Sequence, residues 1–180
     1  MTALIVNFYA GPGAAKSTLT AATFAALKWL GIECEMALEY AKDKVWEEST
    51  ALLNNQLYVF GKQQHRIYRL SNKVDVIITD APLLNSVYYD AKNDPIFRSM
   101  IKQEYEKHDN LDFLVHRTKP YNPKGRLQTE SEAISIDSEI KRILDVYTNG
   151  KYISIPGEPA QVEKTIVPNI LSMLELRKGF

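Results

Sequence analysis

The chain has 180 residues, of which 45% are hydrophobic and 24% charged, a composition typical of a soluble globular protein with one domain, here residues 1–180. The 22 basic and 22 acidic side chains give a formal net charge of zero, which excludes a strong overall attraction to nucleic acid or to a membrane surface. No apolar run reaches the roughly 18 residues of a membrane span. The single cysteine, Cys34, excludes an internal disulfide and fits a reducing cytoplasm.

The first predicted elements are a strand, a tight loop and a helix. Residues 3–10, ALIVNFYA, form an apolar run that ends at Gly-Pro-Gly, which indicates a buried strand followed by a turn. Residues 16–31 carry apolar side chains at helical spacing and end in Gly31, a residue typical of helix C-termini. A second strand is predicted over residues 32–38, IECEMAL, and the polar cluster EYAKD follows it.

The same alternation of strands and helices continues to the end of the chain. We predict two helical pieces between about 43 and 72, with a break near Asn54 and Asn55, and then a strand over 73–82. A helix over 94–108, with Asp94 as N-cap and Pro95 in its first turn, leads to a strand over 111–117 and a loop over 118–128. The last elements are a helix that starts at Thr129 with a capping box to Glu132, a short strand over 151–157 and a C-terminal helix.

This alternation predicts an α/β fold in three layers, with a five-stranded parallel sheet covered by helices on both faces. In such folds ligands bind beyond the carboxyl ends of the strands. That edge would bring together the loop after the first strand, Glu39 after the second, Asp80 after the third and Arg117 after the fourth.

The segment GPGAAKST (residues 11–18) is close to the phosphate-binding pattern G-x-x-x-x-G-K-[ST]. Lys16 and Ser17 are in place, but the two pattern glycines fall on Ala10 and Ala15. Backbone N–H groups of such a loop bind phosphate, helped by the positive end of the following helix. We therefore predict that ATP binds to Gly11, Pro12, Gly13, Ala14, Ala15, Lys16, Ser17 and Thr18. The alternative is a strand-to-helix turn without a ligand.

Two carboxylates are candidates for the chemistry at this edge. Asp80 closes the apolar strand VIITD and would hold Mg²⁺ together with Ser17; the alternative is an N-cap for a following helix. Glu39 would accept a proton from a substrate hydroxyl. Its alternatives are a surface acid or an ion pair with Lys42 or Lys44, and Asp43 is a weaker candidate for the same role.

Two basic segments are candidates for binding phosphate. The loop HRTKPYNPKGR (residues 116–126) carries Arg117, Lys119, Lys124 and Arg126 without an acid, and we predict a lid in which Arg117 and Arg126 act in catalysis. The alternative is a solvated basic loop. Arg66 and Arg69 lie on one helical face and could clamp a substrate phosphate, or they could belong to a salt-bridged surface helix.

The sequence resembles bacteriophage P-loop kinases of the thymidylate-kinase type. The resemblance spans nearly the whole chain, to about Ile155, and lies in FYAGPGAAKST, EYAKDKVWEE, NNQLYVFGKQQHRIYRL, DVIITDAPLL and KPYNPKGRLQTE. Within that group the chain looks most like the 5-hydroxymethyluridine DNA kinases, which phosphorylate the hydroxymethyl group of a modified base already within DNA, a step toward hypermodified thymidine.

The resemblance implies ATP and Mg²⁺ at Gly13, Lys16, Ser17 and Thr18 with Asp80 nearby, a substrate role for Glu39, and a lid role for Arg117 and Arg126. It also implies DNA that contains modified thymidine as the partner and the cytoplasm of an infected bacterium as the location. Two alternatives stay open, a kinase of free deoxynucleoside monophosphates and a non-catalytic ATP-binding switch. The sequence leaves open whether the chain forms a homodimer.

Overall fold

A five-stranded parallel sheet forms the centre of the molecule, in the order β2-β3-β1-β4-β5. The structure is a computed structural model that describes residues 2–124 and 127–178. Its strands are β1 (Leu4–Tyr9), β2 (Cys34–Met36), β3 (Val76–Thr79), β4 (Asp109–His116) and β5 (Ile153–Pro156). All six residues of the central strand β1 are buried, because neighbouring strands and covering helices enclose it on every side. The α/β fold with a five-stranded parallel sheet, predicted from the sequence, is confirmed.

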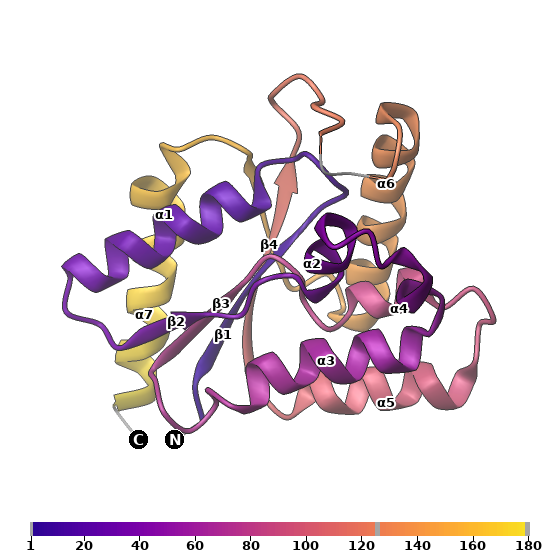
Figure 1. Cartoon of the computed structure of the whole chain (residues 1–180). Coiled ribbons are helices and arrows are strands. Elements are labelled where there is room, and N and C mark those ends of the chain that lie inside the picture. Colours follow the sequence, from indigo (N-terminus) through magenta and orange to yellow (C-terminus); the bar gives the residue numbers. More distant parts are fainter. Residues whose placement is uncertain (1, 125–126, 179–180) are drawn as a thin grey trace.

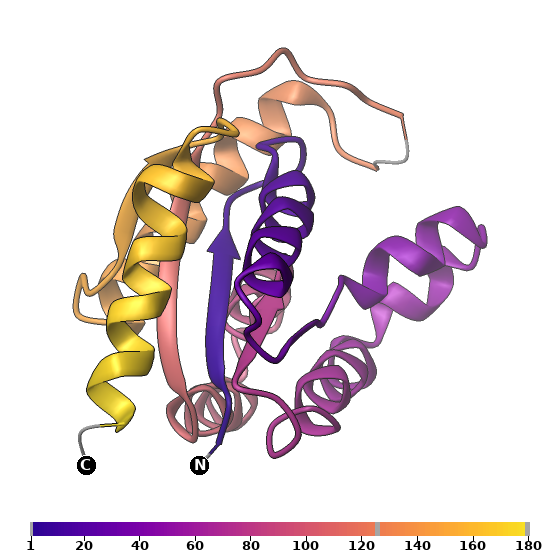
Figure 2. The ribbon, with the colours of Figure 1, turned by 90° about the vertical axis from the view of Figure 1, so that its left-hand side faces the viewer.

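Helices cover both faces of this sheet (Figures 1 and 2). The helical elements are α1 (Lys16–Trp29), α2 (Tyr40–Trp46), the 3₁₀ helix η1 (Thr50–Asn54), α3 (Gln56–Tyr68), α4 (Asn85–Tyr89), α5 (Pro95–Glu106), α6 (Glu130–Tyr147), the π-helical segment η2 (Val162–Ile166) and α7 (Val167–Lys178). One apolar core joins the sheet to α1 and α7. The other joins it to α3, α4, α5 and α6.

Local signals in the sequence set several helix ends. The Asp94 side chain accepts hydrogen bonds from the N–H groups of Ile96 and Phe97, as expected of an N-cap before Pro95. The Thr129 hydroxyl accepts from the Glu132 N–H, and the Glu132 carboxylate accepts from the Thr129 N–H at 2.6 Å, which completes the predicted capping box. Both predicted N-termini are confirmed.

Strand lengths depart from the sequence prediction, because partners elsewhere in the chain set them. Strand β2 covers only three of the seven residues predicted, since it pairs with β3 from Cys34↔Val76 to Met36↔Ile78. The chain then leaves the sheet edge toward α2. Strand β4 begins at Asp109, two residues earlier than predicted, because its first residues still pair with Leu4 and Ile5 of β1.

Two segments project from the same end of the sheet. The arm formed by α2 and η1 extends to the right in Figure 2, and the loop between β4 and α6 arches across the top. The arm and the loop therefore stand on either side of the carboxyl ends of the strands, where the sequence places its candidate residues.

Within the described residues, no helix is long and apolar enough to cross a membrane.

Candidate active site

A cavity of about 540 Å³ opens at the carboxyl ends of the strands. The loop after β1, the start of α1, the residues after β3 and the side chain of Glu39 line it on one side. Residues of α2, η1, α3, α4 and α6 and of the loop after β4 line the rest. Its volume lies in the range typical of ligand pockets. One cavity therefore contains both the predicted phosphate loop and Glu39, the predicted acceptor of the substrate proton.

The loop after β1 has the geometry of a phosphate cradle. Gly13 (φ 83°) and Ala15 (φ 74°) both adopt left-handed backbone conformations, and α1 begins directly afterwards at Lys16. Among the described residues, no hydrogen-bond partner is found for the backbone N–H groups of residues 13–18. Several unsatisfied donors thus converge at the positive end of a 14-residue helix, the arrangement that binds phosphate oxygens.

The two alanines that replace pattern glycines occupy different environments. Ala10 directly follows β1, is buried in the core that includes α1 and needs no positive φ. Ala15 holds a left-handed conformation that a residue with a Cβ adopts at a cost of about 1–2 kcal/mol. Gly11 is required by close packing, since a Cβ there would lie 2.4 Å from the backbone oxygen of Ala133 in α6. The departure from the pattern therefore matters at Ala15 and not at Ala10.

Lys16 folds back over the loop. Its Nζ donates to the carbonyl oxygens of Ala10 at 2.8 Å and Gly11 at 3.0 Å. Burial lowers the pKa of Lys16, and the carboxylates of Glu39, Asp80 and Asp137 oppose that effect. Lys16 lines the cavity at the phosphate loop, which places a cation where the phosphates of a nucleotide would bind.

A clamp that the sequence analysis did not identify fixes the loop from the far side. Asp137 of α6 accepts from the Gly11 N–H at 2.6 Å and from Arg117 Nη2 at 3.0 Å, and Arg117 Nη1 donates to the Pro12 carbonyl at 2.8 Å. Gly13 lies against this clamp, since a Cβ on it would lie 3.0 Å from Arg117 Nη1. Arg117 is therefore bound to the phosphate loop, and its side chain does not line the cavity.

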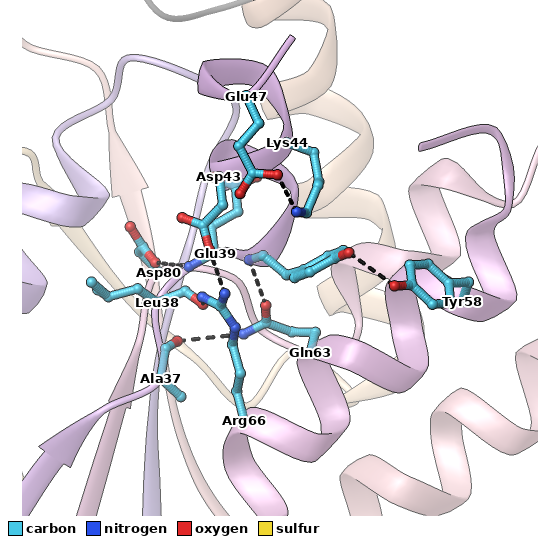
Figure 3. Close-up of polar contacts among 11 residues, drawn as sticks. Ala37, Leu38, Glu39, Asp43, Lys44, Glu47, Tyr58, Gln63, Arg66 and Asp80 are labelled. Carbon is cyan, nitrogen blue, oxygen red and sulfur yellow. Dashed lines mark hydrogen bonds and ion pairs between the residues drawn. The ribbon is translucent and has the colours of Figure 1, made fainter. Parts of the chain in front are cut away.

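Glu39 and Asp80 meet as the sequence predicts. Glu39 precedes α2, and its N–H donates to Asp80 Oδ1 at 3.1 Å (Figure 3). Burial raises the pKa of both carboxyl groups, while Lys16 opposes the shift in each. Among the described residues Glu39 has no ion-pair partner, and Lys44 pairs with Glu47. The ion-pair alternative for Glu39 is therefore not found among the described residues. Asp80 is not an N-cap, because α4 begins only at Asn85.

Three predicted substrate residues lie outside the cavity lining. Arg66 forms an ion pair with Asp43 and donates to the Leu38 carbonyl at 2.9 Å (Figure 3). Arg69 is exposed and follows the last residue of α3. The structure therefore does not form the phosphate clamp predicted from Arg66 and Arg69, because Asp43 already binds one of the two guanidinium groups.

The loop between β4 and α6 covers one side of the cavity. Lys119 and Lys124 line it, together with Pro120, Asn122, Leu127 and Gln128. Arg126, a predicted catalytic residue, lies outside the described residues. The prediction of a basic loop over the site agrees with this placement, and the cations that reach the cavity from the described part of the loop are Lys119 and Lys124.

The residues present fit ATP and Mg²⁺. Ser17 and Asp80 both line the cavity, Ser17 in the first turn of α1 and Asp80 directly after β3. Within the described part of the chain, no cluster of three or more His, Cys, Asp or Glu side chains forms a ready metal site. Mg²⁺ in phosphate chemistry keeps several waters and needs only one or two protein ligands beside the phosphates. The Ser17 hydroxyl and the Asp80 carboxylate, which line the same cavity as the phosphate loop, meet that requirement.

The part of the cavity wall formed by α2, η1, α3, α4 and α6, which we call the acceptor side, has both apolar and polar side chains. Val45, Trp46 and Leu53 line it from the arm, and Ile136 and Ile140 from α6. The polar groups of this wall belong to Lys42, Gln56, Gln63, Asn85, Ser86 and Tyr89. No pattern in the sequence distinguishes these residues, because a helical residue that faces a cavity has the same spacing as one that faces the core.

Comparisons with known proteins found similarity to solved structures but none in sequence. No protein-family model and no curated protein matches the sequence. A solved structure of shikimate kinase from Acinetobacter baumannii in complex with shikimate is similar, with a TM-score of 0.46 and 14% identity over 94% of this chain and 93% of that one. The structure of APE1195 gives a TM-score of 0.41 and 14% identity over 99% of this chain and 96% of that one. At these values neither likeness bears on activity or substrate.

Proposed function

We propose that the protein is an ATP-dependent phosphotransferase. The observation that carries this proposal is the meeting of Lys16, Glu39 and Asp80 in one cavity, beside the free N–H groups of residues 13–18. A cradle for phosphate, a cation and a carboxylate able to accept a proton are the parts that phosphoryl transfer requires. A non-catalytic ATP-binding switch would not need Glu39 beside Lys16.

Each residue has a role that its position supports. The N–H groups of the phosphate loop and Lys16 would hold the phosphates of ATP, and Ser17 and Asp80 would hold Mg²⁺, which neutralises charge on the transferred group when bound. Glu39 would accept the proton of the acceptor hydroxyl, and its raised pKa brings it closer to the value of an effective base near neutrality. Lys119 and Lys124 would shield the reaction from water.

For the acceptor, we propose the hydroxymethyl group of 5-hydroxymethyl-2′-deoxyuridine in phage DNA, a step in thymidine hypermodification. The motive is the resemblance to 5-hydroxymethyluridine DNA kinases. The acceptor wall supports it, since Trp46 and Val45 offer apolar surface for a base and Gln63, Asn85 and Ser86 offer hydrogen bonds for its polar edge. A base in a duplex must leave the stack to enter such a cavity, at a cost of a few kcal/mol.

A kinase of free deoxynucleoside monophosphates is the second candidate. The net charge of zero favours it, because proteins that bind nucleic acid usually carry a basic excess. The pairing of Arg66 with Asp43 bears on both candidates, since it removes one cation that either substrate could use.

A transfer assay with labelled ATP separates the candidates. The acceptors are DNA that contains 5-hydroxymethyluracil, DNA of the same sequence with thymine, and the free monophosphates of both nucleosides. We expect label only in the hydroxymethylated DNA, and we expect none with Glu39→Gln. Label in the monophosphates and none in the DNA would establish the second candidate. ATP binding without transfer to any acceptor would leave the protein a switch.

A further inference from the structure

The segment before β3 has an unusual charge distribution. Residues 49–74 include Lys62, Arg66, Arg69 and Lys73 and contain no Asp or Glu, although acidic and basic residues are equal in number over the whole chain. Helix α3 lies entirely within this segment. This segment therefore carries only basic charge on a molecule without net charge, as segments that bind a polyanion do.

Five neighbouring residues on one side of α3 form what we call the outer face of α3: Tyr58, Lys62, His65, Tyr68 and Arg69. All five are exposed, whereas Phe60, Gln63 and Ile67 turn to the interior. Tyr68 is 67% exposed and Tyr58 is 39% exposed. Three rings and two cations thus share one solvent-facing surface.

The rings and cations of this face are interleaved. Lys62 Nζ lies 5.2 Å from the centre of the Tyr58 ring, and the rings of His65 and Tyr68 are 6.4 Å apart. Lys62 and Arg69 form no ion pair with any described residue. Arg66, at the border of the face, is already neutralised by Asp43. Two cations therefore remain available to a ligand.

The outer face adjoins the cavity. Gln56, Val59 and Gln63 of the same helix line the cavity wall. Tyr58 precedes Val59, and its hydroxyl lies 3.3 Å from that of Tyr40 in α2. Figure 3 shows Tyr58 pointing from α3 toward α2, on the far side of Gln63 from Asp80. A chain molecule with one unit in the cavity could therefore continue over α3.

We propose that the outer face of α3 binds a single strand of nucleic acid next to the base held in the cavity. The phosphates would lie against Lys62 and Arg69, and neighbouring bases would stack on Tyr58, His65 and Tyr68. The 13 residues of α3 extend about 20 Å, enough for a few nucleotides. This proposal rests on the proposed function in one respect, because it takes the acceptor base to be part of a polymer.

The rings distinguish nucleic acid from an acidic protein as the partner. Both would be attracted by Lys62 and Arg69, but only nucleic acid provides a flat ring at each unit to stack on exposed aromatic side chains. An acidic protein does not supply a ring at each unit, so the two tyrosine rings and the histidine ring would have no regular stacking partners. Polyglutamate therefore serves as the competitor in the test.

Binding is measured without ATP, so that it does not depend on phosphoryl transfer. The probe is a fluorescein-labelled strand of about 20 unmodified deoxythymidines, long enough to cover the face and its surroundings, and the readout is anisotropy as a function of salt. For the Lys62→Gln/Arg69→Gln variant we expect at least fivefold weaker binding, as an order of magnitude, and a salt slope reduced by roughly 1.4 because two phosphate contacts are lost.

The matched control is Lys28→Gln/Lys164→Gln, which removes the same charge from exposed lysines on the opposite face of the sheet. We expect its affinity and salt slope to equal those of the unaltered protein. Tyr68→Ala should weaken binding by roughly tenfold through lost stacking, and Tyr68→Phe should restore it. Thermal unfolding of each variant establishes that the fold is intact.

Equal losses in the test and control variants, unchanged binding of the Tyr68→Ala variant, or displacement of the probe by polyglutamate at equal charge would each overturn the proposal. Failure of the proposed function gives a different pattern. If the probe binds as expected and hydroxymethylated DNA accepts no label, the outer face is a nucleic-acid surface of a protein with another activity. If free monophosphates accept label and the probe does not bind, the outer face proposal is wrong while kinase activity stands.

Discussion

The two sides of the cavity are built in different ways. On the phosphate side, a short loop between β1 and α1 supplies backbone N–H groups, and Lys16, Arg117 and Asp137 hold that loop through hydrogen bonds of 2.6 to 3.0 Å. On the acceptor side, single side chains from α2, η1, α3, α4 and α6 form the wall. Trp46 on this side is 59% exposed.

For the proposed phosphotransferase, this difference separates the groups that would act in catalysis from those that would select the acceptor. Backbone donors are independent of side-chain identity, so the phosphate side can stay the same while acceptors change. Substitutions on the acceptor side alter which molecule fits, whereas substitutions on the phosphate side should abolish transfer to every acceptor. The four predictions that follow concern the phosphate side and Glu39, in decreasing order of expected effect.

Lys16→Ala should lower phosphoryl transfer by at least roughly a hundredfold, because it removes the cation of the phosphate loop, which would neutralise developing negative charge. The loss should be the same for every acceptor that the protein accepts. Labelled ATP measures the rate, and circular dichroism checks the fold. Lys28→Ala, on the exposed side of the same helix α1, is the control and should keep full activity. A folded, fully active Lys16→Ala variant would contradict the assignment of the phosphate loop.

Glu39→Gln should keep the affinity for ATP and lower kcat by about 10²–10⁴-fold, because the amide cannot accept the hydroxyl proton. The carboxyl pKa of Glu39 is raised by burial, so kcat/KM should rise with pH through a value above the ordinary glutamate range near 4.3. Below that value the base is protonated and the enzyme inactive.

The pH profile of the Glu39→Gln variant identifies the titrating group. Loss of the acidic limb assigns it to Glu39. A limb that persists at the same pH assigns it to Asp80, whose pKa burial also raises. An unchanged kcat would remove Glu39 from the chemistry altogether.

Asp137→Ala should loosen the phosphate loop from α6. It leaves the Gly11 N–H and the Arg117 guanidinium without their acceptor, which should lower the free energy of unfolding by about 1–3 kcal/mol and ATP affinity severalfold. Asp137→Asn keeps an acceptor for Gly11 and should recover part of both. Calorimetry and chemical unfolding measure the two effects. Asp145→Ala, an exposed residue of the same helix, should change neither, and an equal loss there would show that α6 itself has been weakened.

Ala15→Gly should have the smallest effect and the opposite sign. Removing the Cβ from a residue at φ 74° relieves about 1–2 kcal/mol of strain, partly offset by the greater entropy of glycine in the unfolded chain. Titration with a non-hydrolysable ATP analogue should show equal or tighter binding. Ala14→Gly is the control, because Ala14 is buried and has no positive φ, and it should only destabilise. Markedly weaker ATP binding by Ala15→Gly would contradict the geometry of the loop.

Elements whose signals are local could be predicted from the sequence. The apolar run before Gly-Pro-Gly predicted β1, Asp94 with Pro95 predicted the start of α5, and Thr129 with Glu132 predicted that of α6. The carboxyl-edge rule for parallel sheets then predicted that Glu39 and Asp80 lie together, and the two residues share a hydrogen bond. These predictions held because a cap, a turn or an apolar run depends on residues within one turn or one strand of each other.

Only the tertiary structure decided which partner each polar side chain has. Asp137 reaches Gly11 from 126 residues away, and Arg117 reaches Pro12 from 105 residues away. Spacing in the sequence does not predict such contacts, because they depend on how elements far apart in the chain pack against one another. The same is true of Arg66, which the helical spacing placed beside Arg69 and which the fold instead pairs with Asp43. Periodicity determines which side of a helix a residue occupies, and packing determines what that side meets.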